Sequence, residues 1–354
     1  MESLLWIERN ANSMKNIFDY TVDELTDLYI SEFNQKKYRA VQTFKWLYQE
    51  NEYDFFKMSD LPLDMRKKLS ENFSTFTLKQ EQMKLSNDGT TKFLFKLEDG
   101  AAVETVLMKY NFGNSVCVSS QVGCRMKCDF CASSKLSFER NLTTGEIIQQ
   151  ILLVSQHIGE KISNIVFMGI GEPFDNYDNV MRAIRILNEP HGLGIGARHI
   201  TVSTSGLVPQ ILRFADEGIQ ANLSISLHAA TNEIRDKVMP VNKAYNIDVL
   251  LQACKKYIEE TNRRITFEYA VMYGLNDTIR DACKLADLLE GMLCHVNLIP
   301  INPVEGAPYR RPSQNIMMNF RDALNNRGIT ATIRRELGSD VDAACGQLRR
   351  QFFE

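Results

Sequence analysis

Between residues 116 and 334 the chain alternates short apolar segments with amphipathic ones, and this alternation restricts the possible fold more than any other feature. The apolar segments have the length of buried strands, and the amphipathic segments repeat apolar residues at helical spacing. Repeated strand–helix units require a parallel sheet, because each helix returns the chain to the edge where the next strand begins. About six units and a final strand fall short of the eight of a closed barrel. The sequence therefore predicts an α/β fold, a partial (β/α)6 barrel that stays open.

The elements of this barrel can be placed from the hydrophobic pattern. The expected strands are 115–119, 165–168, 199–203, 221–227, 265–271, 295–299 and 330–334. The expected helices are 144–157, 179–187, 208–217, 247–260, 278–289 and 313–325. A ligand site should lie at the C-terminal ends of the strands, as in other parallel α/β folds.

Before residue 100 the pattern changes to short helices followed by a hairpin. Segments 21–32, 36–48 and 59–73 have helical spacing, and the first opens with a capping box, Thr21 and Glu24. Two strand-like segments, 92–97 and 102–107, flank a turn at 98–100. We therefore expect three parts. They are an N-terminal helical accessory domain over 1–90, a connecting hairpin over 91–115, and the barrel with a C-terminal cysteine loop over 116–354.

Three cysteines stand close together in the loop after the first barrel strand. Cys124, Cys128 and Cys131 have the spacing C-x3-C-x2-C, and thiolates grouped in one loop are typical ligands of an iron–sulfur cluster. A [4Fe–4S] cluster held by three thiolates leaves one iron open, which can chelate the amino and carboxylate groups of S-adenosylmethionine (SAM). The alternative is a structural zinc site, which usually adds a second closely spaced ligand pair, and none follows here. The spacing favours an enzyme that cleaves SAM reductively to a carbon radical.

Polar residues follow several of the expected strands. Glycines after a strand allow a ligand to approach the backbone closely, and a carboxylate there can accept from an ammonium group. Because the C-terminal ends of parallel strands meet at one edge of the sheet, these residues together predict a single pocket. They are Gly171 and Glu172 after 165–168, Ser203 at the end of 199–203, Ser226, Leu227 and His228 around the end of 221–227, and Asn302 after 295–299.

Two further cysteines stand where a thiol could react. Cys117 lies on an apolar strand, where a cysteine is usually a small buried apolar residue. Cys345 lies in a short loop of small residues directly before a glycine, which makes its thiol accessible. Asp340 and Asp342 in the same loop would disfavour a thiolate, so the sequence offers no evident source of thiol activation. The remaining cysteines, Cys254, Cys283 and Cys294, fall in helix or strand patterns and are expected in the core.

A series of motifs resembles the RlmN/Cfr family of radical SAM RNA methyltransferases. The motifs occupy 103–106, 117–124, 168–173, 198–206, 225–229 and 342–348, in family order. The resemblance covers nearly the whole chain, including 37–40 and 46–47 in the N-terminal part. Val122 before Gly123-Cys124 and Leu107 after 103–106 look more like the RlmN branch than the Cfr branch.

The resemblance implies a role for each candidate residue. Cys345 would accept a methyl group and become S-methylcysteine, and Glu104 would be the proton acceptor. Cys117 would resolve the protein–RNA adduct by forming a disulfide with Cys345. The [4Fe–4S] cluster would be held by Cys124, Cys128 and Cys131. SAM, two molecules per turnover, would be held by Gly171, Glu172, Ser203, Ser226, Leu227, His228 and Asn302.

The reaction implied by the resemblance is methylation of C2 of adenosine in 23S rRNA and in tRNA, with an external electron donor such as flavodoxin or ferredoxin. The alternative within the family is Cfr-like methylation of C8 of a 23S rRNA adenosine, which confers antibiotic resistance. Two other classes stay open from the residues alone. A non-catalytic iron–sulfur electron carrier usually has four cysteine ligands, and a radical enzyme acting on a small molecule or peptide would need neither Cys117 nor Cys345.

The charge balance bears on the RNA partner and on location. A net charge of −3 over 354 residues means that any RNA-binding surface is a local patch. There is no apolar run of about 18 residues and no leader-like sequence in Met1 to Asn10, so we expect no membrane span. Crowded cysteines suit a reducing compartment, and we expect a cytoplasmic protein. The basic candidates for RNA contact are Lys36, Lys37, Arg39, Lys45, Arg66, Lys67, Lys68, Arg310, Arg311, Arg334, Arg335, Arg349 and Arg350.

Overall fold

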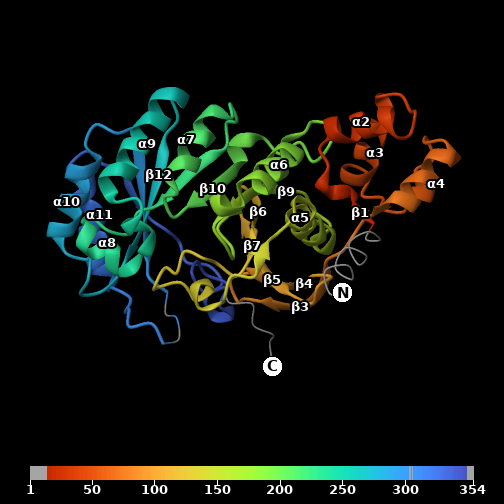
Figure 1. Cartoon of the computed structure of the whole chain (residues 1–354). Helices are drawn as coiled ribbons and strands as arrows, with labels where there is room; N and C mark the ends of the chain where they lie inside the picture. Colours follow the sequence, from red (N-terminus) through yellow and green to blue (C-terminus); the bar gives the residue numbers. More distant parts are fainter. Residues whose placement is uncertain (1–13, 303, 305, 349–354) are drawn as a thin grey trace, which may run out of the picture.

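The computed structural model describes residues 14–302, 304 and 306–348, and a single ten-stranded sheet runs through its centre (Figure 1). The strand order is β14-β13-β12-β11-β10-β9-β6-β5-β4-β3, so the strands of this sheet follow chain order, with β7 and β8 set apart in a sheet of their own. The parallel strands are β6 (Gly113–Cys117), β9 (Ile162–Phe167), β10 (Ile200–Thr204), β11 (Asn222–Ser226), β12 (Ile265–Val271), β13 (Cys294–Pro300) and β14 (Ala331–Ile333). Since β14 and β3 form the two edges, the barrel formed by the described residues is open, as predicted.

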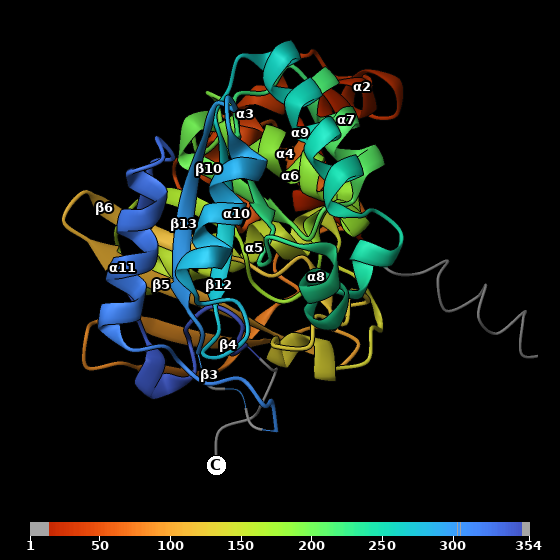
Figure 2. The ribbon, with the colours of Figure 1, turned by 90° about the vertical axis from the view of Figure 1, so that its left-hand side faces the viewer.

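Each connection between parallel strands carries a helix. The expected ones are α5 (Thr144–Ile158), α6 (Tyr177–Asn188), α7 (Val208–Asp216), α9 (Ile247–Thr261), α10 (Ile279–Leu289) and α11 (Gln314–Asn325). Several of these helices begin after an N-cap residue whose side chain accepts from a backbone N–H group of the first turn. Thr143 caps α5 in this way, and Asn246 caps α9. Figure 2 shows α10 and α11 beside β12 and β13 on the outer side of the sheet. The predicted partial barrel of βα units is confirmed.

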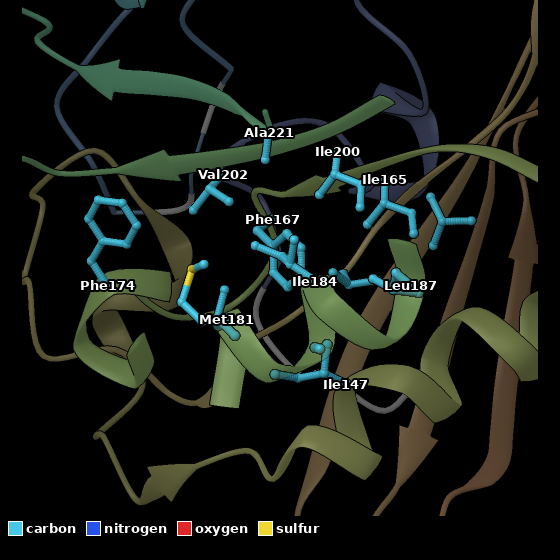
Figure 3. Packing of buried hydrophobic residues seen from close by; sticks show 14 of the residues in the cluster. Ile147, Ile165, Phe167, Phe174, Met181, Ile184, Leu187, Ile200, Val202 and Ala221 are labelled. Atoms are coloured by element: carbon cyan, nitrogen blue, oxygen red, sulfur yellow. The ribbon is translucent and has the colours of Figure 1, made fainter. Parts of the chain in front are cut away.

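The main core lies between the sheet and the helices that cover it. Figure 3 shows Ile165 and Phe167 of β9 meeting Met181 and Ile184 of α6, and all four side chains are buried. A helix with this apolar stripe is stable only against a partner surface, which the outer face of the sheet supplies. The strand ends are thereby held rigidly, and the residues that follow them keep fixed positions.

One helix of the barrel could not be predicted from the hydrophobic pattern. The helix α8 (Asn232–Val238) follows β11, opened by Thr231, whose side chain accepts from the backbone N–H of Ile234. It is short, and its buried side chains are Arg235 and Val238. A buried arginine looks like a surface residue in the sequence, so periodicity places no helix here.

The expected hairpin forms and continues the barrel sheet. Strands β4 (Thr91–Lys96) and β5 (Ala102–Tyr110) pair antiparallel, and β5 pairs antiparallel with β6. A further strand, β3 (Lys79–Leu85), pairs with β4 at the edge. Its side chains are mostly exposed and polar, so the apolar pattern gave no sign of it. Strands β3, β4 and β5 thus form a three-stranded antiparallel extension of the parallel sheet.

The N-terminal helices pack against the back of the barrel beside α5 and α6 (Figure 1). They are α2 (Val22–Ser31), α3 (Tyr38–Tyr48) and α4 (Leu63–Asn72), with short strands β1 (Lys15–Asn16) and β2 (Phe73–Ser74). The carboxylate of Asp19 accepts from the backbone N–H of Gly145 at 2.6 Å, and Arg182 pairs with Glu24 at 3.0 Å. The predicted capping box of Thr21 and Glu24 opens α2.

Within the described ranges, no helix is long and apolar enough to cross a membrane. The segment Met1 to Asn10, on which the prediction about a leader depends, lies outside the described residues, as do Arg349 and Arg350.

Candidate active site

A large cleft opens at the C-terminal ends of the parallel strands, where the site was expected. It encloses about 950 Å³, counting space open to solvent. Most of the predicted residues line it. They come from the cysteine loop, from the C-terminal ends of β9, β10, β11 and β13, and from the loop after β14. They are Cys124, Cys128, Cys131, Gly171, Glu172, Ser203, Ser226, His228, Asn302 and Cys345.

The three-cysteine loop forms one wall of the cleft. It runs between β7 (Gln121–Val122) and β8 (Arg140–Asn141), which pair with each other and close its base. The backbone N–H of Cys131 donates to the carbonyl of Cys128 at 3.1 Å. Burial raises the pKa of all three thiols, that of Cys124 to about 12. A bound metal group reverses this effect, because coordination stabilises the thiolates.

The donor set of this loop fits an iron–sulfur cluster. No three His, Cys, Asp or Glu side chains of the described residues converge as ligands of one metal ion. Three thiols that line one cleft from a single loop are the donor type that iron–sulfur clusters take. Cys124, Cys128 and Cys131 are the residues that would hold it.

Other lining residues offer polar atoms to a chelating ligand. The side-chain oxygen of Asn302 is buried and has no hydrogen-bond partner, although its amide nitrogen donates to the carbonyl of Cys345 at 3.0 Å. A buried acceptor without a donor is costly, so its presence in the cleft favours a ligand that donates to it. Ser203 and Ser226, at the ends of β10 and β11, line the same cleft. These residues fit a polar cofactor such as SAM.

The segment Gly169 to Glu172 is also held by contacts within the protein. A Cβ at Gly169 would lie 2.6 Å from the carbonyl oxygen of Val118, and one at Gly171 would lie 2.6 Å from the side chain of Gln121. Packing against these neighbouring residues therefore requires glycine at both positions. The Glu172 carboxylate already accepts from the backbone N–H groups of Phe174 and Ser205, at 3.0 and 2.7 Å. Burial raises its pKa.

Leu227 is the one predicted cofactor residue that does not line the cleft. It is buried, its N–H donates to the carbonyl of Glu268, and its own carbonyl accepts from Arg235. Glu268 lines the cleft instead, on β12, and the sequence analysis missed it. Its carboxylate accepts from Asn297 at 2.8 Å, and burial raises its pKa. A single Glu inside a strand pattern carries no signal that distinguishes it from a surface residue.

His228 lines the cleft as a neutral imidazole. Its Nδ1 accepts from the backbone N–H of Ala270 at 2.9 Å, so the proton is carried by Nε2. The ring meets Phe130 of the cysteine loop edge to face, with centroids 4.9 Å apart. Burial, and to a smaller extent the positive charge of Arg235, lowers the pKa of His228 to about 3.

This neutral histidine makes stability dependent on pH. An unfolded histidine has a pKa of about 6.5, so below that pH the unfolded chain binds a proton that the folded chain excludes. The free energy of unfolding should fall with decreasing pH, by on the order of 1.4 kcal/mol per pH unit from this residue. His228→Asn, whose Oδ1 can replace Nδ1, should remove this contribution. Urea unfolding at about pH 6 and about pH 4 checks this prediction, and identical pH slopes in both proteins would contradict it.

A second, smaller cavity lies next to the cleft and contains both reactive-thiol candidates. It is lined by Cys117, at the end of β6, and by Cys345. Both are free thiols, and burial raises the pKa of Cys117 to about 12. The two cavities share a wall made of Met168, Ile299, Asn302, Arg334 and Cys345. Cys345 therefore reaches the cofactor cleft on one side and Cys117 on the other.

The loop that carries Cys345 crosses the mouth of the barrel from one edge of the sheet to the other. It follows β14 and reaches the β3–β4 turn, where Ser86 and the backbone of Asn87 donate to Asp340 and Asp88 accepts from Gly338. The backbone N–H of Ala132 donates to the carbonyl of Gly346 at 2.7 Å, which joins it to the cysteine loop (Figure 1). The carboxylate of Asp340 is thus directed to the turn, not to the thiol.

A fully buried ion pair supports this loop from below. Lys92 of β4 lies 3.4 Å from the carboxylate of Glu104 of β5, and their side chains are 2% and 0% exposed. The Lys92 ammonium also donates to the carbonyl of Asp342 at 3.2 Å. Burial lowers the pKa of Lys92, and Glu104 counteracts this effect. Glu104 lies on the same face of β5 as Val106, which lines the smaller cavity.

Removing Lys92 should destabilise the protein. In Lys92→Met, Glu104 remains buried without its charge partner, and breaking a buried pair in this way costs about 3–5 kcal/mol. The double variant Lys92→Met/Glu104→Leu should recover most of that loss, because no lone charge remains. Urea unfolding of the three proteins tests this prediction. A single variant as stable as the parent would contradict it.

Arg334 lies between the two cavities, not on the surface where the sequence analysis placed it. Its side chain is 23% exposed and approaches Glu268 at 3.9 Å. It lines both cavities. The negative charge of a Cys345 thiolate is the main cause that raises the pKa of Arg334. The positive charge of Arg334, in turn, partly offsets the rise that burial causes in the pKa of Cys117. Arg334 therefore supplies the positive charge near the thiols that the sequence did not reveal.

Several other basic residues are engaged within the protein. Arg66 donates to the carbonyls of Phe56, Ser59 and Leu61, and Arg311 pairs with Glu336. These contacts hold loops and leave fewer cations for an external partner. The basic candidates that are exposed to solvent are Lys36, Lys37, Lys45, Lys67, Arg310, Arg311 and Arg335.

Comparison with known proteins gives a consistent result over the whole chain. Residues 118–286 match the family model of the radical SAM superfamily, and residues 15–74 match that of the ribosomal RNA large subunit methyltransferase N-terminal domain. A probable dual-specificity RNA methyltransferase RlmN of Geobacillus kaustophilus is 51% identical, over 95% of this chain and 93% of its own. One of Staphylococcus aureus with the same description is 50% identical, over 95% and 93%. The crystal structure of a radical SAM methyltransferase from Sphaerobacter thermophilus has a TM-score of 0.90 and 44% identity, over 95% of this chain and 100% of that one.

Proposed function

Because this chain belongs to the RlmN family of radical SAM RNA methyltransferases, we propose that it methylates C2 of adenosine in 23S rRNA and in tRNA. Cys345 is the carrier of the methyl group, Glu104 is the proton acceptor and Cys117 is the resolving thiol. Each turnover uses two molecules of SAM, one as methyl donor and one as radical source.

The chemistry of the target carbon explains why two thiols are needed. C2 of adenine is electrophilic, so a sulfonium methyl group cannot be transferred to it by direct displacement. When bound, the [4Fe–4S] cluster and SAM supply a 5′-deoxyadenosyl radical. Covalent catalysis by Cys345 then divides a step that direct displacement cannot achieve into several feasible ones.

The protein residues act in sequence. The Cys345 sulfur forms a bond to the methyl carbon of SAM, its proton leaves, and S-adenosylhomocysteine is released. The methyl group on Cys345 loses a hydrogen atom to the radical, and its carbon joins C2 of the adenine. Glu104 takes the ring proton, and the adduct loses one electron, which the oxidised cluster would accept. Cys117 loses its proton and its sulfur bonds to the Cys345 sulfur, which breaks the bond to the former methyl carbon. That carbon takes up a proton, and the methylated base is released.

The observation that carries this proposal is the position of Cys345. Its side chain lines the cofactor cleft and the smaller cavity, where Cys117 lies. A methyl carrier must meet SAM on one side and a resolving thiol on the other, and no further cysteine lines the smaller cavity. Arg334 in the shared wall places a positive charge beside the carrier.

The RNA partner and the source of electrons are part of the same proposal. The target base leaves its stack to enter the cavity, while the exposed lysines of the N-terminal module, Lys36, Lys37, Lys45 and Lys67, contact phosphates. An external donor such as flavodoxin or ferredoxin reduces the cluster. A cytoplasmic location would keep the thiols reduced.

The test combines two mass measurements on protein purified without oxygen. The peptide that contains Cys345 is analysed for an added methyl group, and 23S rRNA and tRNA treated with the enzyme are analysed for modified nucleosides. Methylated Cys345 and 2-methyladenosine are the expected results. An unmodified Cys345 in protein with an intact cluster and SAM would overturn the mechanism.

The same experiment separates the two branches of the family. A methylated Cys345 together with 8-methyladenosine would indicate Cfr-like C8 methylation. The comparisons favour C2, since the curated relatives reported above are described as RlmN over nearly their whole length.

A further inference from the structure

Arg235 of α8 is the largest side chain that the described residues bury completely, with 0% exposure. All five of its N–H donors are used. Nη2 donates to the carbonyls of Ser205 and Ser226, at 2.7 and 3.1 Å, and Nε donates to that of Leu227 at 3.1 Å. Nη1 donates to the side chain of Asn242 and the carbonyl of Tyr245, at 3.0 and 3.3 Å.

These contacts join the strand ends that form the cofactor cleft. Ser205 directly follows β10, and Ser226 ends β11. Both residues line the cleft, and Arg235 holds their carbonyls from behind. A planar guanidinium with fixed donors fixes the spacing of two neighbouring backbones more precisely than a flexible ammonium can.

None of the five acceptors carries a charge. Among the described residues, no carboxylate lies within ion-pair distance of Arg235, and the nearby carboxylate of Asp236 accepts from Asn242. Burial lowers the pKa of Arg235 to about 10, so the side chain stays cationic at neutral pH. A buried cation without a counter-ion is strongly disfavoured, which calls for a negative group that belongs to the working enzyme.

The nearest source of such charge is the cysteine loop. The thiolate form of Cys128 is the first favourable electrostatic partner of Arg235, ahead of Cys254 and Asp236. The loop is also tied to α8, because the backbone N–H of Asp129 donates to the carbonyl of Val238 at 3.0 Å. A [4Fe–4S] cluster held by three thiolates carries net negative charge, and that charge increases on reduction.

We propose that Arg235 is a positioning residue with two linked roles, clamping the β10 and β11 ends in the SAM cleft and acting as the internal counter-charge of the cluster. This inference rests on the proposed function only in that the three cysteines hold the cluster. A cation close to the cluster stabilises its reduced, more negative state and so raises its reduction potential. The clamp acts on SAM affinity, while the charge acts on the potential.

Two substitutions separate these roles. Arg235→Lys keeps the positive charge but has only three donors, and Arg235→Gln removes the charge. The cluster is titrated with dithionite as electron source and followed by electron paramagnetic resonance, and SAM affinity is measured without reductant. Arg198→Gln is the matched control, since Arg198 is an exposed arginine at the opposite, N-terminal end of β10.

We expect Arg235→Gln to bind iron and sulfide like the parent but to show a more negative potential. Arg235→Lys should keep the parental potential and bind SAM about tenfold more weakly, the effect of losing one or two good hydrogen bonds. Arg198→Gln should change neither. A parental potential in Arg235→Gln with a full cluster would overturn the counter-charge role, and parental SAM affinity in Arg235→Lys would overturn the clamp.

A second measurement covers the case in which Arg235→Gln does not retain a cluster. In that case the iron and sulfide content of Arg235→Lys is measured after the same preparation. Arg235→Lys should retain the cluster, because it keeps the positive charge that balances the cluster. Loss of the cluster from Arg235→Lys to the same extent as from Arg235→Gln would overturn the counter-charge role. Absence of any cluster in the parent would instead refute the proposed function, so the two failures are distinguishable.

Discussion

Replacing Cys345 by alanine is expected to abolish RNA methylation, with a loss on the order of 10⁴-fold or more, because the substitution removes the sulfur that carries the methyl group. The fold of the loop should survive, since its anchors are made by other groups. Asn302 donates to the backbone carbonyl of residue 345, and Ala132 to that of Gly346. Iron content and SAM affinity should therefore stay close to those of the parent. Nucleoside mass spectrometry of treated RNA provides the measurement.

The matched control for this variant is Cys283→Ala. Cys283 is also half-buried, but it lies on α10, away from both cavities. It should methylate RNA at the parental rate. If Cys345→Ala formed 2-methyladenosine as fast as the parent, Cys345 could not be the methyl carrier.

The second large effect is expected at Arg334. Arg334→Met should lower methylation by about 10²–10³-fold, the usual loss when a preorganised charge is removed from a site shielded from water. The reason is that Arg334 lines both cavities together with Cys345 and Cys117, and its charge opposes the effect of burial on the pKa of Cys117. Arg334→Lys should retain part of the rate, because it keeps the charge but not the guanidinium geometry.

A chemical probe isolates the effect on the thiol. Iodoacetamide alkylates the thiolate form of cysteine, so Arg334→Met should slow alkylation of Cys345 at neutral pH in cluster-free protein. Arg321→Met, on the outer helix α11 beside Asp322, serves as the control and should alkylate like the parent. Equal alkylation rates at Cys345 in the parent and in Arg334→Met would contradict a role of Arg334 in activating the thiol.

The barrel and much of the cleft could be predicted from the sequence because their signals are local. Strand and helix periods appear within each segment, and residues after parallel strands must meet at one edge of the sheet. Thus β12 has the bounds Ile265–Val271 that the pattern predicts. The cysteines of the cluster loop lie within eight residues of one another in the sequence, so their proximity needs no tertiary argument.

Other residues of the site could not be found in this way. Lys92, Arg235 and Arg334 look like surface cations in the sequence, because charged residues are almost always exposed. Their burial depends on partners far away in the chain. Lys92 is paired with Glu104 and reaches the carbonyl of Asp342, 250 positions later.

The sequence by itself determined the open α/β barrel, the three-thiol loop and the set of strand-end residues that face a common cleft. Only the tertiary structure decided where Cys345 lies, because its loop is placed by contacts with the β3–β4 turn, the cysteine loop and Asn302. It also decided which cations are buried. Periodicity encodes which face of an element is apolar, whereas the pairing of buried charges depends on long-range contacts that no local pattern records.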